Sequence, residues 1–245
     1  MVKEGQKEVI IPTLQNLFAR FTTMKRSSAY SVLLLELIAG IFLSISSLLV
    51  FLNLRSEVFE KEFTSIDTSV AIFIDSFRNP VLTQSMIIIS FFGREVIFVV
   101  TIIVVILLLL KKHRREAVLF SLTIFGSALL NTQLKNIIQR PRPTLNPLQI
   151  VHDFSFPSGH ADSSLVFYIT LTYLVFRFTH NKKTTLAMFF LSAVIILLVG
   201  VSRIYLGVHY PSDVIAGYIF GFWWCVTMIT IDKTLSLTEV LRKQS

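Results

Sequence analysis

The chain has 245 residues, 53% of them hydrophobic, and a formal net charge of +8 at pH 7. With a mean hydropathy of +0.69, this composition excludes an ordinary soluble domain, and the single Cys225 excludes an intrachain disulfide framework. The basic residues stand in short patches between apolar runs, which indicates a membrane surface as the partner and argues against nucleic acid.

Six apolar stretches reach or come close to the length of about 20 residues that a helix needs to cross roughly 30 Å of hydrocarbon. They cover residues 29–54, 86–110, 117–134, 163–178, 185–201 and 214–231. The first starts too far into the chain, and is too long, to be a cleaved signal peptide. Several of the others are short, so we expect them to extend into their polar flanks.

The second stretch is interrupted by the polar sequence Gly93-Arg94-Glu95. We therefore expect residues 80–92 to form an interfacial or partly inserted helix, and the span itself to begin near Val96. Apolar residues also recur at helical spacing in the mixed segment 55–79 between the first two spans, which is typical of amphipathic helices lying on a membrane.

The predicted fold is an all-α membrane protein with six transmembrane helices and amphipathic interfacial helices between the first and second spans. Residues 1–245 should form one domain, because no repeat or long linker divides the chain. Within it, residues 1–28 are expected to be a cytoplasmic N-terminal segment and residues 232–245 a cytoplasmic tail.

Lysine and arginine gather in alternate connections between the spans, and such cation-rich segments normally stay in the cytoplasm. The cation-rich set consists of Lys3, Lys7, Arg20, Lys25, Arg26, Lys111, Lys112, Arg114, Arg115, Arg177, Lys182, Lys183, Lys233, Arg242 and Lys243. Both termini should therefore be cytoplasmic, and the opposite connections should face outward.

Those outward connections carry three polar clusters, at 135–143, 157–160 and 202–213. Ionisable groups close to hydrocarbon cost several kcal/mol unless something satisfies them, so their presence indicates a function. Lys135 should end the third span, Ser158 should cap the fourth, and Pro211 should begin the sixth. The N-termini of the fourth and sixth spans would then offer backbone N–H groups to one anion.

The side chains of the clusters suit phosphoryl transfer. Arg142 and Arg203 can each hold two phosphate oxygens, and Lys135 adds a point charge. A neutral imidazole can attack phosphorus if an acceptor holds its other nitrogen, and Asp213 lies one helical turn after His209. His160 has no carboxylate nearby in sequence, which suits it as the general acid.

These clusters resemble the three motifs of the type 2 phosphatidic acid phosphatase superfamily. KxxxxxxRP corresponds to residues 135–143, PSGH to 157–160, and SRxxxxxHxxxD to 202–213, without a substitution. The resemblance implies that His209 forms a phosphohistidine, that Asp213 orients it, and that His160 protonates the leaving group. It assigns the phosphate to Lys135, Arg142, Ser158, Gly159 and Arg203, and it implies no metal or other cofactor.

By the same resemblance, the chain is expected to be a hydrolase of the bacterial cell membrane that acts on a lipid phosphate at the outer face. The predicted substrate is undecaprenyl pyrophosphate, because Arg140 adds a cation for a second phosphate to the family's own set. Phosphatidylglycerophosphate or phosphatidate is the alternative. Arg140 is otherwise interpreted as surface charge, and neither Glu36 nor His152 receives a role.

Three other functions stay open at this point. A lipid phosphotransferase could use the same residues, with a second lipid taking the place of water. A vanadium haloperoxidase is disfavoured by the six spans, and a lipid-binding or flipping protein without turnover is disfavoured by the complete catalytic set. The oligomeric state is left open.

Overall fold

The computed structural model describes residues 26–60 and 62–242, together with the side chains of 32–60 and 62–237. The described residues form eight helices and no strand, which confirms the all-α class. The helices are α2 (Arg26–Phe59), α3 (Thr64–Asp75), α4 (Pro80–Phe91), α5 (Glu95–Leu110), α6 (Arg114–Ile138), α7 (Gly159–Thr179), α8 (Lys182–Tyr205) and α9 (Pro211–Arg242). The cations Lys3, Lys7, Arg20, Lys25 and Lys243, and the side chains of Arg26 and Arg242, lie outside the described residues.

Five segments in the described part of the chain are long and apolar enough to cross a membrane, which makes this a multi-pass membrane protein. They are Val32–Phe59, Pro80–Leu110, Arg114–Ile138, Lys182–Tyr205 and Pro211–Leu237. Most helices extend past the predicted apolar cores into polar flanks, as expected. The 21 residues of α7 are not among the five, although they would reach about 32 Å. Its first two turns contain several polar residues, among them His160 and Asp162.

The predicted interruption of the second span is confirmed, because α4 ends at Phe91 and α5 starts at Glu95. At the break, a Cβ atom on Gly93 would lie 3.1 Å from the ring of His160 and 2.6 Å from Val199. The carbonyl of Gly93 also accepts a hydrogen bond of 2.8 Å from Ser163 in α7. The chain therefore bends where only glycine allows its backbone to rest against α7.

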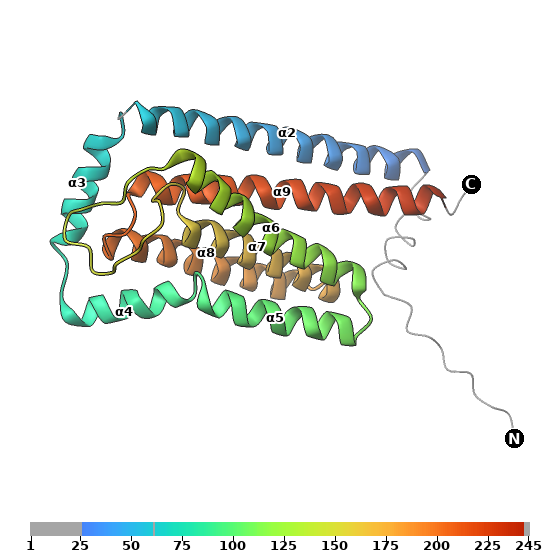
Figure 1. Ribbon diagram of the computed structural model, residues 1–245. Helices are drawn as coiled ribbons and strands as arrows, with labels where there is room; N and C mark the ends of the chain where they lie inside the picture. Colours follow the sequence, from blue (N-terminus) through green and yellow to red (C-terminus); the bar gives the residue numbers. More distant parts are fainter. Residues whose placement is uncertain (1–25, 61, 243–245) are drawn as a thin grey trace, which may run out of the picture.

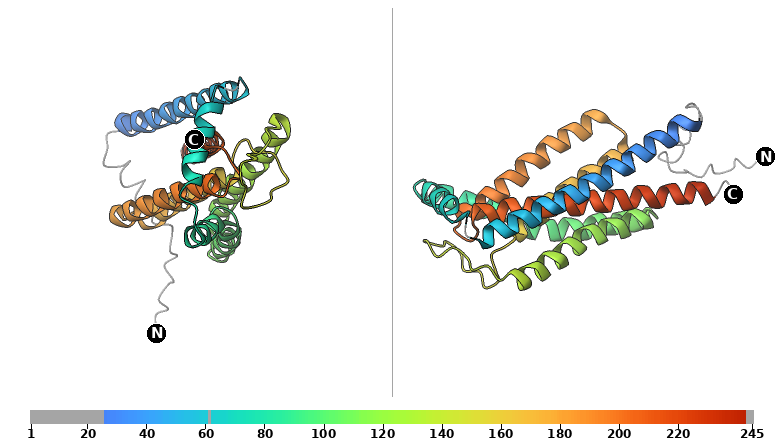
Figure 2. Two further views of the ribbon diagram at one scale, coloured as in Figure 1. Left: turned by 90° about the vertical axis from the view of Figure 1, so that its left-hand side faces the viewer. Right: turned by 90° about the horizontal axis from the view of Figure 1, so that it is seen from above.

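Helix α9 occupies the middle of the bundle and packs against α2, α6 and α7 (Figure 1 and Figure 2). Small residues let its backbone approach the others closely, as is common between membrane helices. A Cβ atom on Gly217 would lie only 2.6 Å from the carbonyl oxygen of Ser158, just before α7. The start of α7 is thus held directly against α9.

The two ends of the bundle differ in what they carry. At one end lie the start of α2, the turn between α5 and α6, and the end of α9 (Figure 1). There Arg177 pairs with Glu116 at 3.1 Å and with Asp232 at 2.5 Å, and Lys233 pairs with Glu36 at 2.8 Å. Glu36, which had no role in the sequence analysis, therefore joins α2 to α9.

The opposite end is formed by α3, the loop 139–158 and the turn between α8 and α9 (Figure 1). The segment 55–79 contains the last turn of α2 and one separate helix, α3. Apolar side chains of α3 such as Ile66, Ile72 and Phe73 are exposed, whereas its Asp67 is 1% exposed. A carboxylate buried this completely must have partners, and they lie in the polar clusters.

Candidate active site

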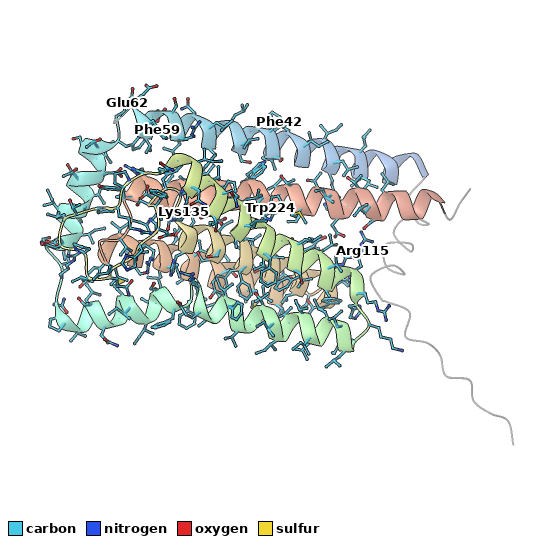
Figure 3. All side chains as sticks on the ribbon, in the orientation of Figure 1. Phe42, Phe59, Glu62, Arg115, Lys135 and Trp224 are labelled. Carbon is cyan, nitrogen blue, oxygen red and sulfur yellow. The ribbon has the colours of Figure 1, made fainter. Side chains whose placement is uncertain are left out.

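The three polar clusters meet at the α3 end of the bundle, each at the end of a helix. Lys135 stands in the last turn of α6, in the interior of the molecule, whereas Arg115 marks the opposite end (Figure 3). Ser158 caps α7, and its hydroxyl accepts a hydrogen bond of 3.5 Å from the backbone N–H of Ala161. Pro211 begins α9 and places Asp213 in the first turn. These four predicted positions are confirmed.

The N-termini of α7 and α9 lie side by side. The backbone N–H of Ser158 donates a 2.9 Å hydrogen bond to the carbonyl of Asp213. Both helices therefore direct the positive ends of their dipoles toward the same region, which favours an anion there.

His209 is held between a carboxylate and a guanidinium. Its Nδ1 lies 3.6 Å from Oδ2 of Asp213, and its Nε2 lies 3.2 Å from Nη1 of Arg142. The hydroxyl of Ser155 donates to Oδ2 of Asp213 and lies 3.4 Å from Nδ1 of His209. The backbone N–H of Tyr210 donates to the same carboxylate oxygen at 2.8 Å. One ring nitrogen thus faces a carboxylate, and the other faces the guanidinium of Arg142.

Burial keeps the imidazole of His209 neutral. The residue is 3% exposed, and this burial lowers the pKa of His209 to about 4, although Asp213 acts in the opposite direction. At neutral pH the ring therefore carries one proton and has one lone pair free, which is the form that can attack phosphorus.

Lys135, in the last turn of α6, and Arg142, on the loop that precedes α7, share a backbone acceptor. Lys135 donates to the carbonyl of Phe154, and Arg142 donates to the carbonyls of Asp153 at 2.8 Å and Phe154 at 3.2 Å. Arg142 also donates to the carbonyl of Val208 at 2.5 Å, next to His209. These backbone contacts place Arg142 against the ring of His209 and hold Lys135 to the same loop.

Arg203 is 3% exposed and lies at the end of α8. Its Nη1 donates to Ser90 of α4 and, at 3.3 Å, to Oε1 of Gln149. Its Nε–H has no hydrogen-bond partner among the described residues. Because an unpaired buried N–H costs about 1–3 kcal/mol, this donor is a natural partner for an oxygen of a bound anion.

His160 and Gly159 begin α7 on its partly exposed side. His160 lies against Gly93 at the break between α4 and α5, and no hydrogen bond to its ring is found within the described part of the chain. A Cβ atom on Gly159 would lie 3.4 Å from Oδ1 of Asn131. The structure therefore brings the predicted site residues to one end of the bundle, with the ring of His160 unpaired.

The interpretation of Arg140 as surface charge is wrong. Its Nη1 donates to Asp213 at 2.5 Å, and its Nη2 donates to Asp67 at 2.8 Å. Its guanidinium lies 4.3 Å from the ring centroid of Tyr210. Burial opposes the charge, but the carboxylates of Asp213 and Asp67 outweigh it and raise the pKa of Arg140 above its ordinary value. Arg140 is therefore a partly exposed bridge between two buried carboxylates.

Asp67 is a site residue that sequence reasoning missed. Besides Arg140, it accepts hydrogen bonds from the backbone N–H and the hydroxyl of Ser212, at 2.9 and 2.6 Å. Ser155, Ser90 and Gln149 were also missed. Only Ser155 had a usable signal, because it stands two residues before the Pro157 that opens a motif.

Replacing Arg140 by alanine should lower the free energy of unfolding by about 3–5 kcal/mol, because Asp67 and Asp213 would stay buried without their cation. Unfolding of the detergent-solubilised protein, followed by circular dichroism, measures the change. Arg55→Ala, at an exposed position on α2, is the matched control and should shift stability by about 0.5 kcal/mol or less. Equal stability of the two variants would contradict the bridging role.

Comparison with known proteins identifies the family of this chain. The family model described as the PAP2 superfamily matches residues 116–236. Phosphatidylglycerophosphatase B of Bacillus subtilis is 31% identical over 72% of this chain and 88% of its own. An undecaprenyl-diphosphatase of Sulfolobus acidocaldarius is 27% identical over 65% of this chain and 75% of its own. The crystal structure of a transmembrane PAP2-type phosphatidylglycerolphosphate phosphatase from Bacillus subtilis superposes with a TM-score of 0.74, at 28% identity, over 78% of this chain and 96% of that one. The chain belongs to the PAP2 superfamily.

Proposed function

We propose that the protein hydrolyses the phosphate monoester or pyrophosphate of a membrane lipid through a phosphohistidine at His209. The observation that carries this proposal is the position of the His209 ring, with Nδ1 toward Asp213 and Nε2 toward Arg142. A neutral, buried imidazole arranged in this way is prepared to attack an anion that the cation holds.

In the first step, Nε2 of His209 attacks phosphorus and forms a P–N bond while the P–O bond to the lipid breaks. The electron pair of that bond goes to the leaving oxygen, and His160 gives it a proton. The positive charge that develops on the His209 ring is stabilised by Asp213, which Arg140 and Ser155 hold in place.

In the second step, a water molecule attacks phosphorus and the P–N bond breaks, which returns His209 to its neutral form. His160, now unprotonated, takes a proton from that water. Lys135, Arg142 and Arg203 hold the phosphate oxygens with the hydroxyl of Ser158 and the backbone N–H of Gly159, because the backbone N–H of Ser158 already donates to the carbonyl of Asp213. The unpaired Nε–H of Arg203 supports its part in this set.

We further propose that α7 is a sixth transmembrane helix and that the site faces the outside of a bacterial cell membrane. Helix α7 packs between α6, α8 and α9, so its polar first turns are covered by other helices. The cation-rich connections Lys111–Arg115 and Lys182–Lys183 would then be cytoplasmic, together with both termini. Helix α3, with its exposed apolar side chains, would lie at the outer surface.

The proposed substrate is undecaprenyl pyrophosphate, on the grounds of its leaving group. When a pyrophosphate is cleaved, the leaving group is a lipid phosphate, which is a better-stabilised oxyanion than the alkoxide that leaves a phosphate monoester. Its departure therefore depends less on a proton from His160. The earlier reason, a second phosphate held by Arg140, no longer applies because Asp67 and Asp213 occupy that guanidinium. Phosphatidylglycerophosphate is a second candidate, supported by the Bacillus subtilis relative whose name refers to it.

His209→Ala should reduce phosphate release by several orders of magnitude, because no atom is left to form the P–N bond. Asp213→Asn should retain more activity, since the nucleophile remains but loses its charged acceptor. Release of inorganic phosphate by the purified protein in detergent is the measurement, with circular dichroism to check folding. Activity should survive EDTA, and vanadate should inhibit it.

Near-normal turnover by His209→Ala would contradict this mechanism, and so would a strict need for a divalent ion. The acid limb of kcat/KM should lie near pH 4 to 5, because His209 must be unprotonated and burial lowers its pKa to about 4. Phosphate transferred to a second lipid, with none released, would identify a phosphotransferase that uses the same site.

The proposed orientation predicts that a membrane-impermeant thiol reagent labels Thr144→Cys but not Lys111→Cys in intact cells. Both positions are exposed, and neither has a left-handed backbone, unlike Asn146 and Lys112. The buried Cys225 is first replaced by serine. Labelling of Lys111→Cys but not of Thr144→Cys would show that the protein has the opposite orientation in the membrane.

The substrate proposal can be tested at Arg94, an exposed cation next to the Gly93 that lies against His160. Arg94→Ala should slow cleavage of undecaprenyl pyrophosphate more than cleavage of phosphatidate. Only the pyrophosphate has a second phosphate group that Arg94 could bind. Phosphate release from each lipid measures the difference. Faster cleavage of phosphatidylglycerophosphate than of undecaprenyl pyrophosphate would favour the second candidate.

A further inference from the structure

Asp153 places a carboxylate directly on two of the cations that the proposed function assigns to phosphate. Its Oδ2 lies 3.2 Å from Nζ of Lys135, and its Oδ1 pairs with Nη2 of Arg142. The side chain of Asp153 is 55% exposed, whereas those of Lys135 and Arg142 are 7% and 13% exposed. The carboxylate therefore covers one buried and one partly exposed cation from the solvent side.

The two cations do not depend on this carboxylate for their positions. Arg142 is held by the carbonyls of Asp153, Phe154 and Val208, and Lys135 by the carbonyl of Phe154. All of these acceptors belong to the backbone and remain if the side chain of Asp153 changes. The carboxylate is the one acceptor in this group that can leave by rotation of a partly exposed side chain.

The charge of Asp153 persists at neutral pH. Partial burial acts to raise the pKa of Asp153, but the cations Lys135 and Arg142 outweigh it and hold that pKa below the ordinary value. A carboxylate and a phosphate present similar pairs of oxygens to a guanidinium. The two anions would therefore compete for the same donors.

We propose that the Asp153 carboxylate is an internal counter-ion that occupies the phosphate position of the free enzyme and is displaced by the substrate. This inference rests on the proposed function for the identity of the anion. The dianionic phosphate of a bound lipid, supported by the burial of its chain, displaces the monoanionic carboxylate. After hydrolysis, the Asp153 carboxylate pairs again with Lys135 and Arg142 and assists the release of inorganic phosphate, which has no lipid chain to strengthen its binding.

The test is the binding of inorganic vanadate and inorganic phosphate to Asp153→Asn, measured by calorimetry on the purified protein in detergent. Asparagine keeps the shape and the backbone carbonyl but loses the charge. The Kd of both anions should fall about three- to tenfold, the range expected from the loss of partly exposed ion pairs. The KM for the lipid should also fall. The kcat should not rise, because inorganic phosphate leaves the variant more slowly.

Glu62→Gln is the matched control, since Glu62 is an exposed carboxylate near the start of α3 at the same end of the molecule (Figure 3). It removes the same charge and should leave both Kd values unchanged. Asp153→Ser provides a second variant that also lacks the carboxylate and should repeat the tightening.

Unchanged or weaker anion binding in both Asp153 variants would overturn the inference. Weaker binding would assign Asp153 to the orientation of the cations, with a matching loss of kcat/KM. Because vanadate binding needs no turnover, a protein that binds vanadate but hydrolyses no lipid phosphate would refute the proposed function and still test Asp153.

Discussion

The carboxylate of Asp213 has no exposure to solvent, and an unpaired charge in such a place would cost several kcal/mol. The surroundings of this one group account for much of the architecture at the α3 end of the bundle. Arg140 reaches it from the segment after α6, Ser155 from the loop before α7, and the N–H of Tyr210 from the turn before α9. Asp67 neutralises the remaining charge of Arg140 and thereby fixes α3 across the end of the bundle. Satisfying one buried charge thus brings together three separate parts of the chain: α3, the loop 139–158, and the start of α9 with the turn before it.

The same arrangement determines what His209 can do. Its position four residues before Asp213 puts one nitrogen near the carboxylate, while burial removes the proton that would block the other. The cations Lys135 and Arg142 are then fixed by backbone carbonyls, which need no particular side chains in the loop. A site built in this way keeps its shape whether an internal carboxylate or a phosphate lies on the cations.

The helix ends could be predicted from the sequence because local rules determine them. Ser158 as a cap, Pro211 as a first helical residue and the break at Gly93 each follow from the chemistry of one residue and its neighbours. The apolar cores of the spans were predictable for the same reason, although their ends extend further into polar flanks than hydropathy indicates. A helix with polar side chains in its first turns, such as α7, is less apolar, and hydropathy alone does not identify it as a span.

The role of Arg140 could not be predicted, because its partner Asp67 lies 73 residues earlier in a segment whose pattern indicates a surface helix. A charged residue beside a motif is equally consistent with substrate binding and with burial, and only the tertiary contact decides between them. Ser90 and Gln149, which contact Arg203, were missed for the same reason.

The covalent intermediate on His209 is the central claim, and it can be observed directly. The purified protein would be mixed with a lipid phosphate labelled with ³²P, quenched within milliseconds under alkaline conditions that preserve phosphohistidine, and digested for mass spectrometry. The account predicts a transient label on the peptide that contains His209 and none on that peptide from His209→Ala. Rapid phosphate release with no labelled histidine, or with the label on His160, would contradict it.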